Sequence, residues 1–402
     1  GRMDRGERRN HRAFLMAGAD FIPYGRQDIS EEDIAAVVDV LRSDYLTQGP
    51  RVPAFEAAIA GACGAAHAVA VNSATSALHI ACLALGVKPG GLVWTAPNTF
   101  VASANVARLC GADVDFVDIG ADDYCMSADA LEAKLAAADL RPDILIPVHF
   151  AGQSADMKRI GAIARAHGIK VIEDASHCIG GSYAGQPIGA CPYSDIAVFS
   201  FHPVKIITTA EGGVATTQDK GLADRMGLFR SHGVTRDPDL MARANAEPWE
   251  YDQVDLGLNY RMTEMQAALG LTQTARLADF VAHRQKMARR YDALLADFPL
   301  VLPWQNPDSH SALHLYPILI DTDKTNCTRR EVFDHLRAEN IGVNVHYQPV
   351  HTQPYYQQLG FRRGDFPVSE WYYDRALSIP LYFGLDEEKQ DRVIAALKGC
   401  LG

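Results

Sequence analysis

The chain has 402 residues, of which 48% are hydrophobic and 22% are charged, a balance typical of globular proteins. No apolar run approaches the roughly 20 residues that a membrane-spanning helix needs, so the sequence predicts no membrane partner. The formal net charge is −11, and the body of the chain has no block rich in lysine and arginine. This disfavours a nucleic-acid surface, although a local pocket for an anionic small molecule is compatible with it.

The cysteines are scattered and form no C-x-x-C pair; they are Cys63, Cys82, Cys110, Cys125, Cys178, Cys191, Cys327 and Cys400. This spacing is poor for a zinc site or a disulfide framework, and we predict no metal. We interpret the thiols as small buried apolar groups in a protein of the reducing cytoplasm. Residues 1–20 are rich in arginine and lack the apolar core of a secretory signal, which predicts a disordered extension or a tag.

Helical and strand-like patterns alternate along residues 21–275. The first helix is expected after Ser30, a predicted N-cap with Asp33 three positions on and apolar residues at helical spacing. Short apolar runs then predict strands at Ala68–Val71, Val93–Ala96, Asp115–Val117, Ile144–Val148, Lys170–Glu173, Ile196–Phe199 and Val214–Thr217. Helical stretches separate most of them. The alternation predicts an α/β fold with a mostly parallel seven-stranded sheet between helices.

The C-terminal part of the chain has a different pattern. A long helical stretch from about Met262 to Phe298 leads out of the alternating region. Beyond it, the patterns predict strands at Tyr316–Ile320 and Gly342–His346 and helices at Arg329–Glu339 and Glu387–Leu397. We therefore predict a large domain over residues 21–275 and a small α+β domain over residues 276–402.

Polar residues at strand ends are the first candidates for a binding site, because parallel sheets bind ligands at the carboxyl ends of their strands. The small-residue run Asn72–Ala77 follows one strand and opens a helix. Its unpaired N–H groups, together with a hydroxyl of Thr75 or Ser76, suit an anion such as phosphate. An ordinary capped helix start has the same pattern.

Two ionisable residues follow later strands of the predicted sheet. Asp174 ends a strand that looks buried on both faces, where a carboxylate needs a partner such as the protonated pyridine nitrogen of pyridoxal phosphate (PLP). Helix capping is the alternative for Asp174, and His177 either supports this carboxylate or is packed. Lys205 follows an apolar strand and has apolar neighbours, so desolvation favours the neutral amine that attacks an aldehyde. Ser200, at the same strand end, is a further donor to a phosphate.

The stretch Ser200–Gly213 contains the motifs SFHPVK and TTAEGG. It resembles the DegT family of sugar aminotransferases, which have PLP fold-type I, and the similarity runs from about Ile22 to the C-terminus. The resemblance implies that Lys205 binds the cofactor aldehyde covalently and that Asp174 pairs with the pyridine nitrogen. It also implies that pyridoxamine phosphate (PMP) is the amino-carrying form of the cofactor.

The same resemblance implies roles for further residues. Ala74, Thr75 and Ser200 would hold the phosphate, and Phe100 would stack on the cofactor ring, with a core phenylalanine as the alternative. Asn259 matches an asparagine that reaches the cofactor of the neighbouring subunit, which implies a homodimer with shared active sites. Candidate contacts of the nucleotide sugar are Arg230, His232, Tyr316, His346 and His351. For each of these histidines a packed or capping role is an equal alternative.

The runs Phe21–Ile29 and Leu46–Pro50 resemble one branch of the family. They imply transfer of an amino group from L-glutamate to C4 of a UDP-linked 4-keto-6-deoxy-N-acetylhexosamine. Aminotransferases for other nucleotide-linked keto sugars would share every cofactor residue, so they stay an alternative. A sugar dehydratase on the same fold is disfavoured, because such members have histidine in place of Lys205.

A non-catalytic protein that binds PLP or a sugar nucleotide is the alternative from another functional class. The acidic charge and the lack of a helix-turn-helix pattern weaken a DNA-binding regulator of this kind. A dinucleotide oxidoreductase is disfavoured as well, because no G-x-G-x-x-G follows the first predicted strand.

Overall fold

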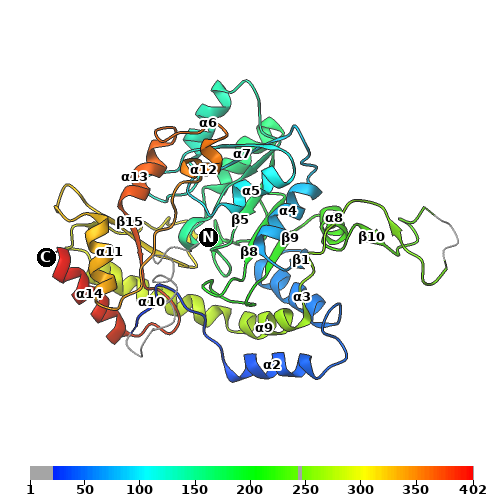
Figure 1. Cartoon of the computed structure of the whole chain (residues 1–402), viewed down its shortest axis with the longest axis horizontal. Coiled ribbons are helices and arrows are strands. Elements are labelled where there is room, and N and C mark those ends of the chain that lie inside the picture. The colour runs from blue at the N-terminus through cyan, green and yellow to red at the C-terminus, as the bar shows by residue number, and fades with distance from the viewer. Residues whose placement is uncertain (1–20, 243–246, 402) are drawn as a thin grey trace, which may run out of the picture.

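The computed structural model describes residues 21–242 and 247–401, so the predicted extension over residues 1–20 lies outside the described residues. Within these ranges no helix is both long and apolar enough to cross a bilayer. The centre of the molecule is a sheet of seven strands (Figure 1). In spatial order they are β1 (His67–Val71), β9 (Gly213–Thr217), β8 (Ile196–Ser200), β5 (Lys170–Asp174), β4 (Ile144–Ile146), β2 (Leu92–Thr95) and β3 (Asp113–Phe116).

The pairing of these strands confirms the predicted mostly parallel sheet. Strands β8, β5, β4, β2 and β3 run parallel to one another. Strand β9 is antiparallel to both β8 and β1, which lets it return directly from β8 through a loop rather than a crossover helix. That loop carries Lys205.

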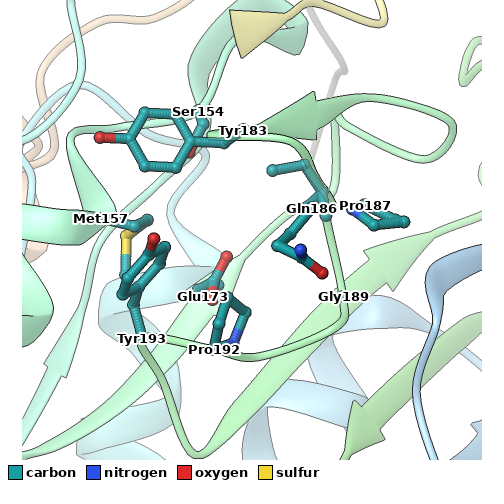
Figure 2. Close-up of a pocket in the computed structure, with 10 residues that line it drawn as sticks. Ser154, Met157, Glu173, Tyr183, Gln186, Pro187, Gly189, Pro192 and Tyr193 are labelled. Atoms are coloured by element: carbon teal, nitrogen blue, oxygen red, sulfur yellow. The ribbon is translucent and has the colours of Figure 1, made fainter. Parts of the chain in front are cut away.

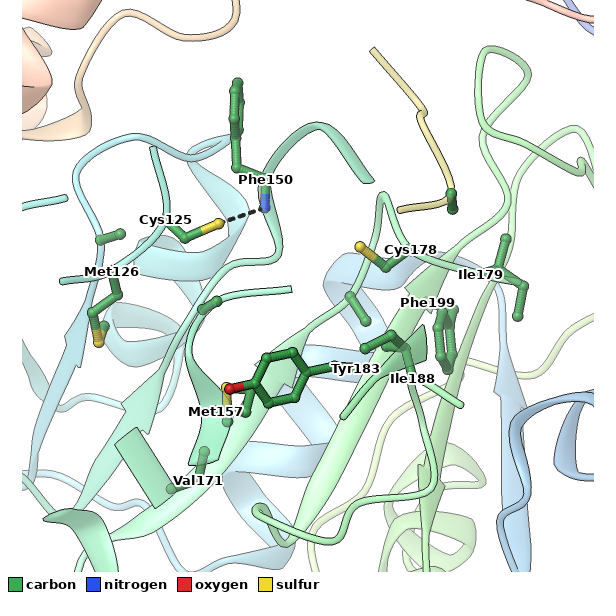
Figure 3. Packing of buried hydrophobic residues seen from close by; sticks show 14 of the residues in the cluster. Cys125, Met126, Phe150, Met157, Val171, Cys178, Ile179, Tyr183, Ile188 and Phe199 are labelled. Carbon is green, nitrogen blue, oxygen red and sulfur yellow. Dashed lines mark hydrogen bonds between the residues drawn. The ribbon is translucent and has the colours of Figure 1, made fainter. Parts of the chain in front are cut away.

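Helices cover both faces of the sheet. One face is packed by α4 (Ala74–Ala84), α5 (Ala102–Leu109) and α8 (Lys220–Arg230), and the other by α3 (Arg51–Cys63), α6 (Ala128–Ala137), α7 (Met157–His167) and α9 (Glu264–Ala275). Successive side chains of a strand point to opposite faces. Accordingly, Val171 and Ile172 of β5 belong to two different hydrophobic clusters. Figure 3 shows part of the first cluster, where Met157 of α7 lies near Val171.

The cysteines are all free thiols, and six of the eight are buried. The sulfur of Cys125 accepts a hydrogen bond from the backbone N–H of Phe150 at 3.4 Å inside the first cluster (Figure 3). Cys327 and Cys400 are partly exposed. The interpretation of the thiols as small buried groups therefore holds for six of them.

Helix α2 (Glu31–Leu41) begins as predicted, with a capping box between Ser30 and Asp33. Asp33 is fully buried and also accepts a hydrogen bond from the side-chain amide of Gln273 in α9 at 2.7 Å. Of the apolar residues at helical spacing, Ile34 is 47% exposed and Leu41 is 56% exposed. Part of the apolar side of this helix therefore lies at the surface of the chain.

The C-terminal part forms a second core around a small antiparallel sheet (Figure 1). Its elements are α10 (Leu277–Leu294), β12 (Leu300–Val301), β14 (Tyr316–Ile320), α11 (Arg329–Ala338), α13 (Pro367–Arg375), β15 (Ala376–Ile379) and α14 (Glu387–Leu401). Ile22 packs into this core and pairs with Ile341, so the first described residues lie with the last third of the chain. The domain boundaries at residues 275 and 276 stay a prediction.

Two predicted elements differ from the structure. The helical stretch over residues 262–298 consists of two helices, α9 and α10, which meet at Arg276. The strand predicted at Gly342–His346 forms a single isolated bridge, between Asn344 and Ser378, and the side-chain carbonyl of Asn344 accepts from the N–H of Val345 at 2.9 Å. The short remaining elements are η1 (Phe150–Gly152), β6 (Ser182–Tyr183), β7 (Gln186–Pro187), β10 (Val234–Thr235), β11 (Asp252–Gln253), β13 (Ser309–His310), η2 (Val350–Thr352) and α12 (Pro354–Gln357).

Candidate active site

A cavity of about 1010 Å³ opens at the carboxyl ends of the parallel strands. Its lining includes eight of the predicted site residues: Ala74, Thr75, Phe100, Asp174, His177, Ser200, Lys205 and His346. They come from the segments that follow β1 and β2, from the last residues of β5 and β8 and the loops after them, and from the C-terminal part of the chain. The carboxyl ends of the parallel strands thus bring residues that are far apart in sequence into one cavity.

One end of the cavity is the start of helix α4. Ser73 is its N-cap and accepts from the N–H of Ser76 at 3.1 Å, while the first helical N–H groups, of Ala74 and Thr75, have no intrahelical acceptor. Gly213 of β9 passes directly behind this turn, and a Cβ at that position would lie 2.5 Å from the nitrogen of Ala74. The close approach of strand and helix therefore requires a glycine here.

We expect Gly213→Ala to displace the first turn of α4. The added methyl group cannot fit against backbone atoms, so overpacking should cost about 1–3 kcal/mol of the free energy of unfolding. Affinity for a phosphate-bearing ligand should fall at least about tenfold, since its N–H donors move. Thermal unfolding and a binding titration with PLP check both effects. Gly227→Ala in α8 is the matched control, because a Cβ there meets nothing within 4 Å; equal behaviour of the two variants would contradict the prediction.

Asp174 is held by a chain of hydroxyl groups. Ser103 donates to its Oδ2 at 2.5 Å, and Ser176 donates to its Oδ1 at 2.5 Å from the hydroxyl and at 3.2 Å from the backbone N–H. Because Ser103 uses its proton on Asp174, the 2.8 Å contact between Thr99 and Ser103 has Thr99 as the donor. Asp174 is 5% exposed and still lines the cavity. Its carboxylate is therefore fixed in one orientation toward a cationic ligand.

Lys205 lies in the loop between β8 and β9, where its backbone N–H bonds to the carbonyl of His202 at 2.9 Å. Ile206 and Ile207 beside it are buried, as the apolar sequence predicts. Burial lowers the pKa of Lys205 to about 8, against the opposing effect of Asp174. A much larger share of this amine is thus neutral near pH 7 than of an exposed lysine, which suits attack on an aldehyde.

The pKa of Lys205 predicts the pH dependence of cofactor attachment. Only the neutral amine attacks, so the rate of PLP attachment to the cofactor-free protein should rise with pH and level off above about 8. An unperturbed lysine would continue to gain rate up to about pH 10.4. Stopped-flow absorbance after mixing with PLP measures the profile. A rate that keeps rising to pH 10 would show that Lys205 is not desolvated.

His177 and Tyr347 form a neutral hydrogen-bonded pair on the cavity wall. The N–H of Ala151 donates to His177 Nδ1 at 3.3 Å, which leaves the ring proton on Nε2, 3.2 Å from the hydroxyl of Tyr347. Burial and the neighbouring Lys205 hold the pKa of His177 well below its usual range. His177 therefore orients the Tyr347 hydroxyl without adding charge; it has no hydrogen bond to Asp174 among the described contacts.

The same wall continues into the C-terminal part of the chain, where the ring of His314 lies 4.5 Å from that of His177 between centroids. His346 Nδ1 lies 2.8 Å from the hydroxyl of Ser378, and burial next to Lys205 lowers the pKa of His346 to about 3. Tyr24, Asn344 and His314 complete this wall. The wall therefore offers neutral hydrogen-bonding groups to a ligand.

The other predicted substrate contacts do not line this cavity. Tyr316 is 1% exposed in β14 and donates its hydroxyl to Asp292 at 2.5 Å, and His351 is fully buried with its Nε2 2.8 Å from Glu370. Both side chains are packed in the interior, so the structure gives them no access to a ligand in the cavity.

Three further predicted residues do not line the large cavity either. Arg230 pairs with Glu56 at 2.5 Å beside a smaller cavity of about 190 Å³. His232 and Asn259 are exposed, and Asn259 pairs through its backbone with Ser231. Contacts of these residues with a ligand held by a second copy stay predictions.

Glu173, the neighbour of Asp174 in sequence, points away from the cavity. It faces a hollow of only about 10 Å³, lined by Tyr183 and Tyr193 among others (Figure 2). Its carboxylate bonds to His149 at 2.6 Å and to Ser194 at 2.5 Å. A hollow of that size holds at most one water molecule, so this acidic group is structural.

Several lining residues were not predicted from the sequence. They include Tyr24, Thr99, Ser176, His202, Glu211, Gln266, His314, Asn344 and Tyr347. Ser103, which holds Asp174, was also missed. Ser176 has a local signal, since a hydroxyl two residues after an aspartate often bonds to it. The others reach the cavity only through tertiary packing.

The arrangement fits a phosphorylated pyridine aldehyde. A helix N-terminus suits the phosphate, a fixed buried carboxylate suits a protonated ring nitrogen, and a desolvated lysine suits the aldehyde. All three groups line the same cavity. The donor set of the site is therefore that of a PLP enzyme.

Comparison with known proteins agrees with this chemistry. Residues 27–398 match the DegT/DnrJ/EryC1/StrS aminotransferase family. The spore coat polysaccharide biosynthesis protein SpsC of Bacillus subtilis is 39% identical over 98% of this chain and 98% of its own length. Two solved structures are similar with TM-scores of 0.86 and 30% identity. One is the putative sugar aminotransferase Spr1654 of Streptococcus pneumoniae in its PMP form, covering 94% of this chain and 98% of that one.

The other is PseC of Helicobacter pylori, an aminotransferase of pseudaminic acid biosynthesis, covering 95% of this chain and 99% of that one. Spr1654 has also been solved in a PLP form. The similarity in both sequence and structure spans nearly the whole chain, including the cavity. The chain therefore belongs to the DegT/DnrJ/EryC1/StrS family and is a PLP-dependent sugar aminotransferase of fold-type I.

Proposed function

We propose that this enzyme transfers the amino group of L-glutamate to C4 of a UDP-linked 4-keto-6-deoxy-N-acetylhexosamine. The observation that carries the proposal is the cavity of about 1010 Å³, which Lys205 and Asp174 both line. Small-molecule sites span about 300–1,000 Å³, so this volume suits a cofactor together with a nucleotide sugar.

Similarity supports the pathway that we propose. PseC, at 30% identity, acts in pseudaminic acid biosynthesis. The runs Phe21–Ile29 and Leu46–Pro50 of this chain resemble UDP-4-amino-4,6-dideoxy-N-acetyl-β-L-altrosamine transaminase of the same pathway. We therefore propose a role in pseudaminic acid synthesis, in the cytoplasm, where free thiols such as those of this chain persist.

The cavity residues have distinct roles in the proposed reaction. Ala74, Thr75 and Ser200 would hold the cofactor phosphate, Asp174 the ring nitrogen, and Phe100 the ring face. When bound, PLP supplies the electron sink for transamination. Lys205 would remove the proton from the donor Cα as a general base, which its pKa of about 8 allows near neutral pH.

We propose that the active unit is a homodimer with shared sites. Asn259 is exposed on this chain, as a residue that reaches into a second copy must be. Nearby Leu256 is 81% exposed, and α2 exposes Ile34 and Leu41. Burial of such apolar side chains against a second copy would be favourable. Sedimentation of the PLP-loaded protein tests this, and a monomer at micromolar concentration would contradict it.

A two-stage experiment tests the reaction. L-Glutamate is first mixed with the PLP-loaded protein, and we expect loss of its visible absorbance with release of one equivalent of 2-oxoglutarate. The UDP-linked 4-keto sugar is then added to the separated protein, and we expect the absorbance to return with a 4-amino sugar as the product. A panel of dTDP-linked keto sugars is the control. Return of absorbance only with a dTDP sugar would overturn the proposed acceptor, and no response to glutamate would overturn the donor.

A further inference from the structure

The imidazole of His314 is a buried group with no partner in the cavity wall. His314 is 4% exposed, and its Nδ1 forms no hydrogen bond within the described residues. Its ring packs against His177 at 4.5 Å between centroids and lines the cavity. The rings of His177 and His346, by contrast, have hydrogen-bond partners. Nδ1 is enclosed by protein, and no hydrogen bond of the His314 ring is found within the described residues, so the part of the ring that faces the cavity is available to a ligand.

Backbone hydrogen bonds hold the segment around His314 against residues of the large domain. The N–H groups on either side of it, at Ala312 and Leu315, donate to Gly152 and Ala151 at 2.9 and 3.1 Å. Leu313 and Ala151 both have left-handed φ values, of 49° and 57°. Such residues cost about 1–3 kcal/mol each and persist where the surroundings hold them, often at ligand sites. His314 is therefore presented to the cavity by a rigid and strained segment.

A buried cation lies directly behind this segment. Arg284 of α10 is 2% exposed, and its Nη1 donates to the carbonyl oxygen of His314 at 3.1 Å and of Leu381 at 2.8 Å. No ion pair among the described residues involves Arg284, and burial lowers its pKa to about 10. A buried guanidinium that meets only neutral carbonyls lacks compensation for its desolvation.

The charge of Arg284 also acts on His314 itself. Burial is the main reason that the pKa of His314 lies well below its usual range, and the neighbouring His177, Lys205 and Arg284 lower this pKa further. His314 is consequently a neutral hydrogen-bonding group in a positive local field. A ligand that accepts a hydrogen bond and carries negative charge satisfies both features of this wall.

We propose that His314 binds a carboxylate of the amino donor, with Arg284 as electrostatic support behind it; this rests on the proposed function. Of the described residues that line the cavity, none is an arginine and Lys205 alone is a lysine, which the cofactor occupies. Within this chain, the carboxylate of the amino donor must therefore bind to neutral groups that donate hydrogen bonds. The keto sugar ring is neutral at its reacting end, so it would gain less from the field of Arg284.

Binding of glutarate tests the proposal. This five-carbon dicarboxylate lacks the amino group and cannot react, so calorimetry on the PLP-loaded enzyme reads affinity without turnover. We expect His314→Phe to raise the Kd of glutarate at least tenfold and His314→Asn, which keeps a hydrogen-bond donor, to raise it less. The Kd of UDP should change less than twofold in both. His310→Asn, an exposed position outside the cavity lining, is the matched control and should bind both ligands normally.

The outcomes separate this inference from the proposed function. An unchanged Kd of glutarate in both His314 variants overturns the inference alone, as does an equal loss of UDP binding. A wild-type enzyme that binds no glutarate overturns it together with the glutamate donor. Rapid mixing with L-glutamate gives an independent reading: the half-saturating concentration should rise in His314→Phe in parallel with the Kd of glutarate.

Discussion

Lys205→Ala should lose roughly 10⁴-fold or more in transamination while the fold stays intact. The lysine is both the group that attaches the cofactor and the general base in the proposed reaction, so its removal takes away two functions. Within the described residues its amine forms no ion pair, and its loss leaves no buried partner unsatisfied. Steady-state assays with L-glutamate and a keto sugar, beside thermal unfolding, measure both parts of the prediction.

Lys220→Ala is the matched control for this variant. Lys220 starts helix α8, is 74% exposed and pairs with Asp224 at 2.7 Å on the surface. Exposed pairs contribute about 0–1 kcal/mol, so both activity and stability should be close to those of the wild type. If Lys205→Ala retained activity within tenfold of the control, Lys205 would not be the catalytic lysine.

Asp174→Asn should lower the rate of the glutamate half-reaction by about 10²–10³-fold, the scale of removing one positioned electrostatic group. The amide has the same shape, but its single oxygen accepts from only one of Ser103 and Ser176, which donate to different oxygens of Asp174 at 2.5 Å. The other serine would turn to accept from the amide NH2. What is lost is the negative charge that stabilises a protonated ring nitrogen. Single-turnover absorbance with L-glutamate measures the rate, and cofactor content is measured separately.

The adjacent carboxylate provides the control for this second variant. Glu173→Gln removes a buried charge from the same strand, but on the side that bonds to His149 and Ser194. It should reduce stability by about 1–3 kcal/mol, since buried partners lose a charged acceptor, and leave the rate within a few-fold. Similar losses of rate in both variants would mean that the effect of Asp174 is general to this strand rather than specific to the cofactor ring.

The positions of the strands along the chain and the candidate residues at their ends could be predicted because they depend on local pattern, whereas the order of the strands in the sheet could not. Lys205 and Asp174 each follow a strand that the apolar runs identify, and the carboxyl ends of parallel strands meet at one edge. The helix start at Ala74 was likewise visible from its small residues. The histidine candidates were harder to separate, because a buried histidine and a ligand-binding histidine have the same local sequence signal.

Alternating apolar runs, helix caps and the residues at strand ends thus determined the α/β fold and the candidate groups for a cofactor, Lys205 and Asp174 among them, since each depends on neighbours within a few positions. Tertiary structure alone decided the rest. It placed His346 in the cavity and His351 in the interior, although they are five residues apart. It also brought the backbone of His314 into contact with Arg284. Contacts between distant segments depend on how the two cores pack, and the local periodicity of the sequence does not reveal them.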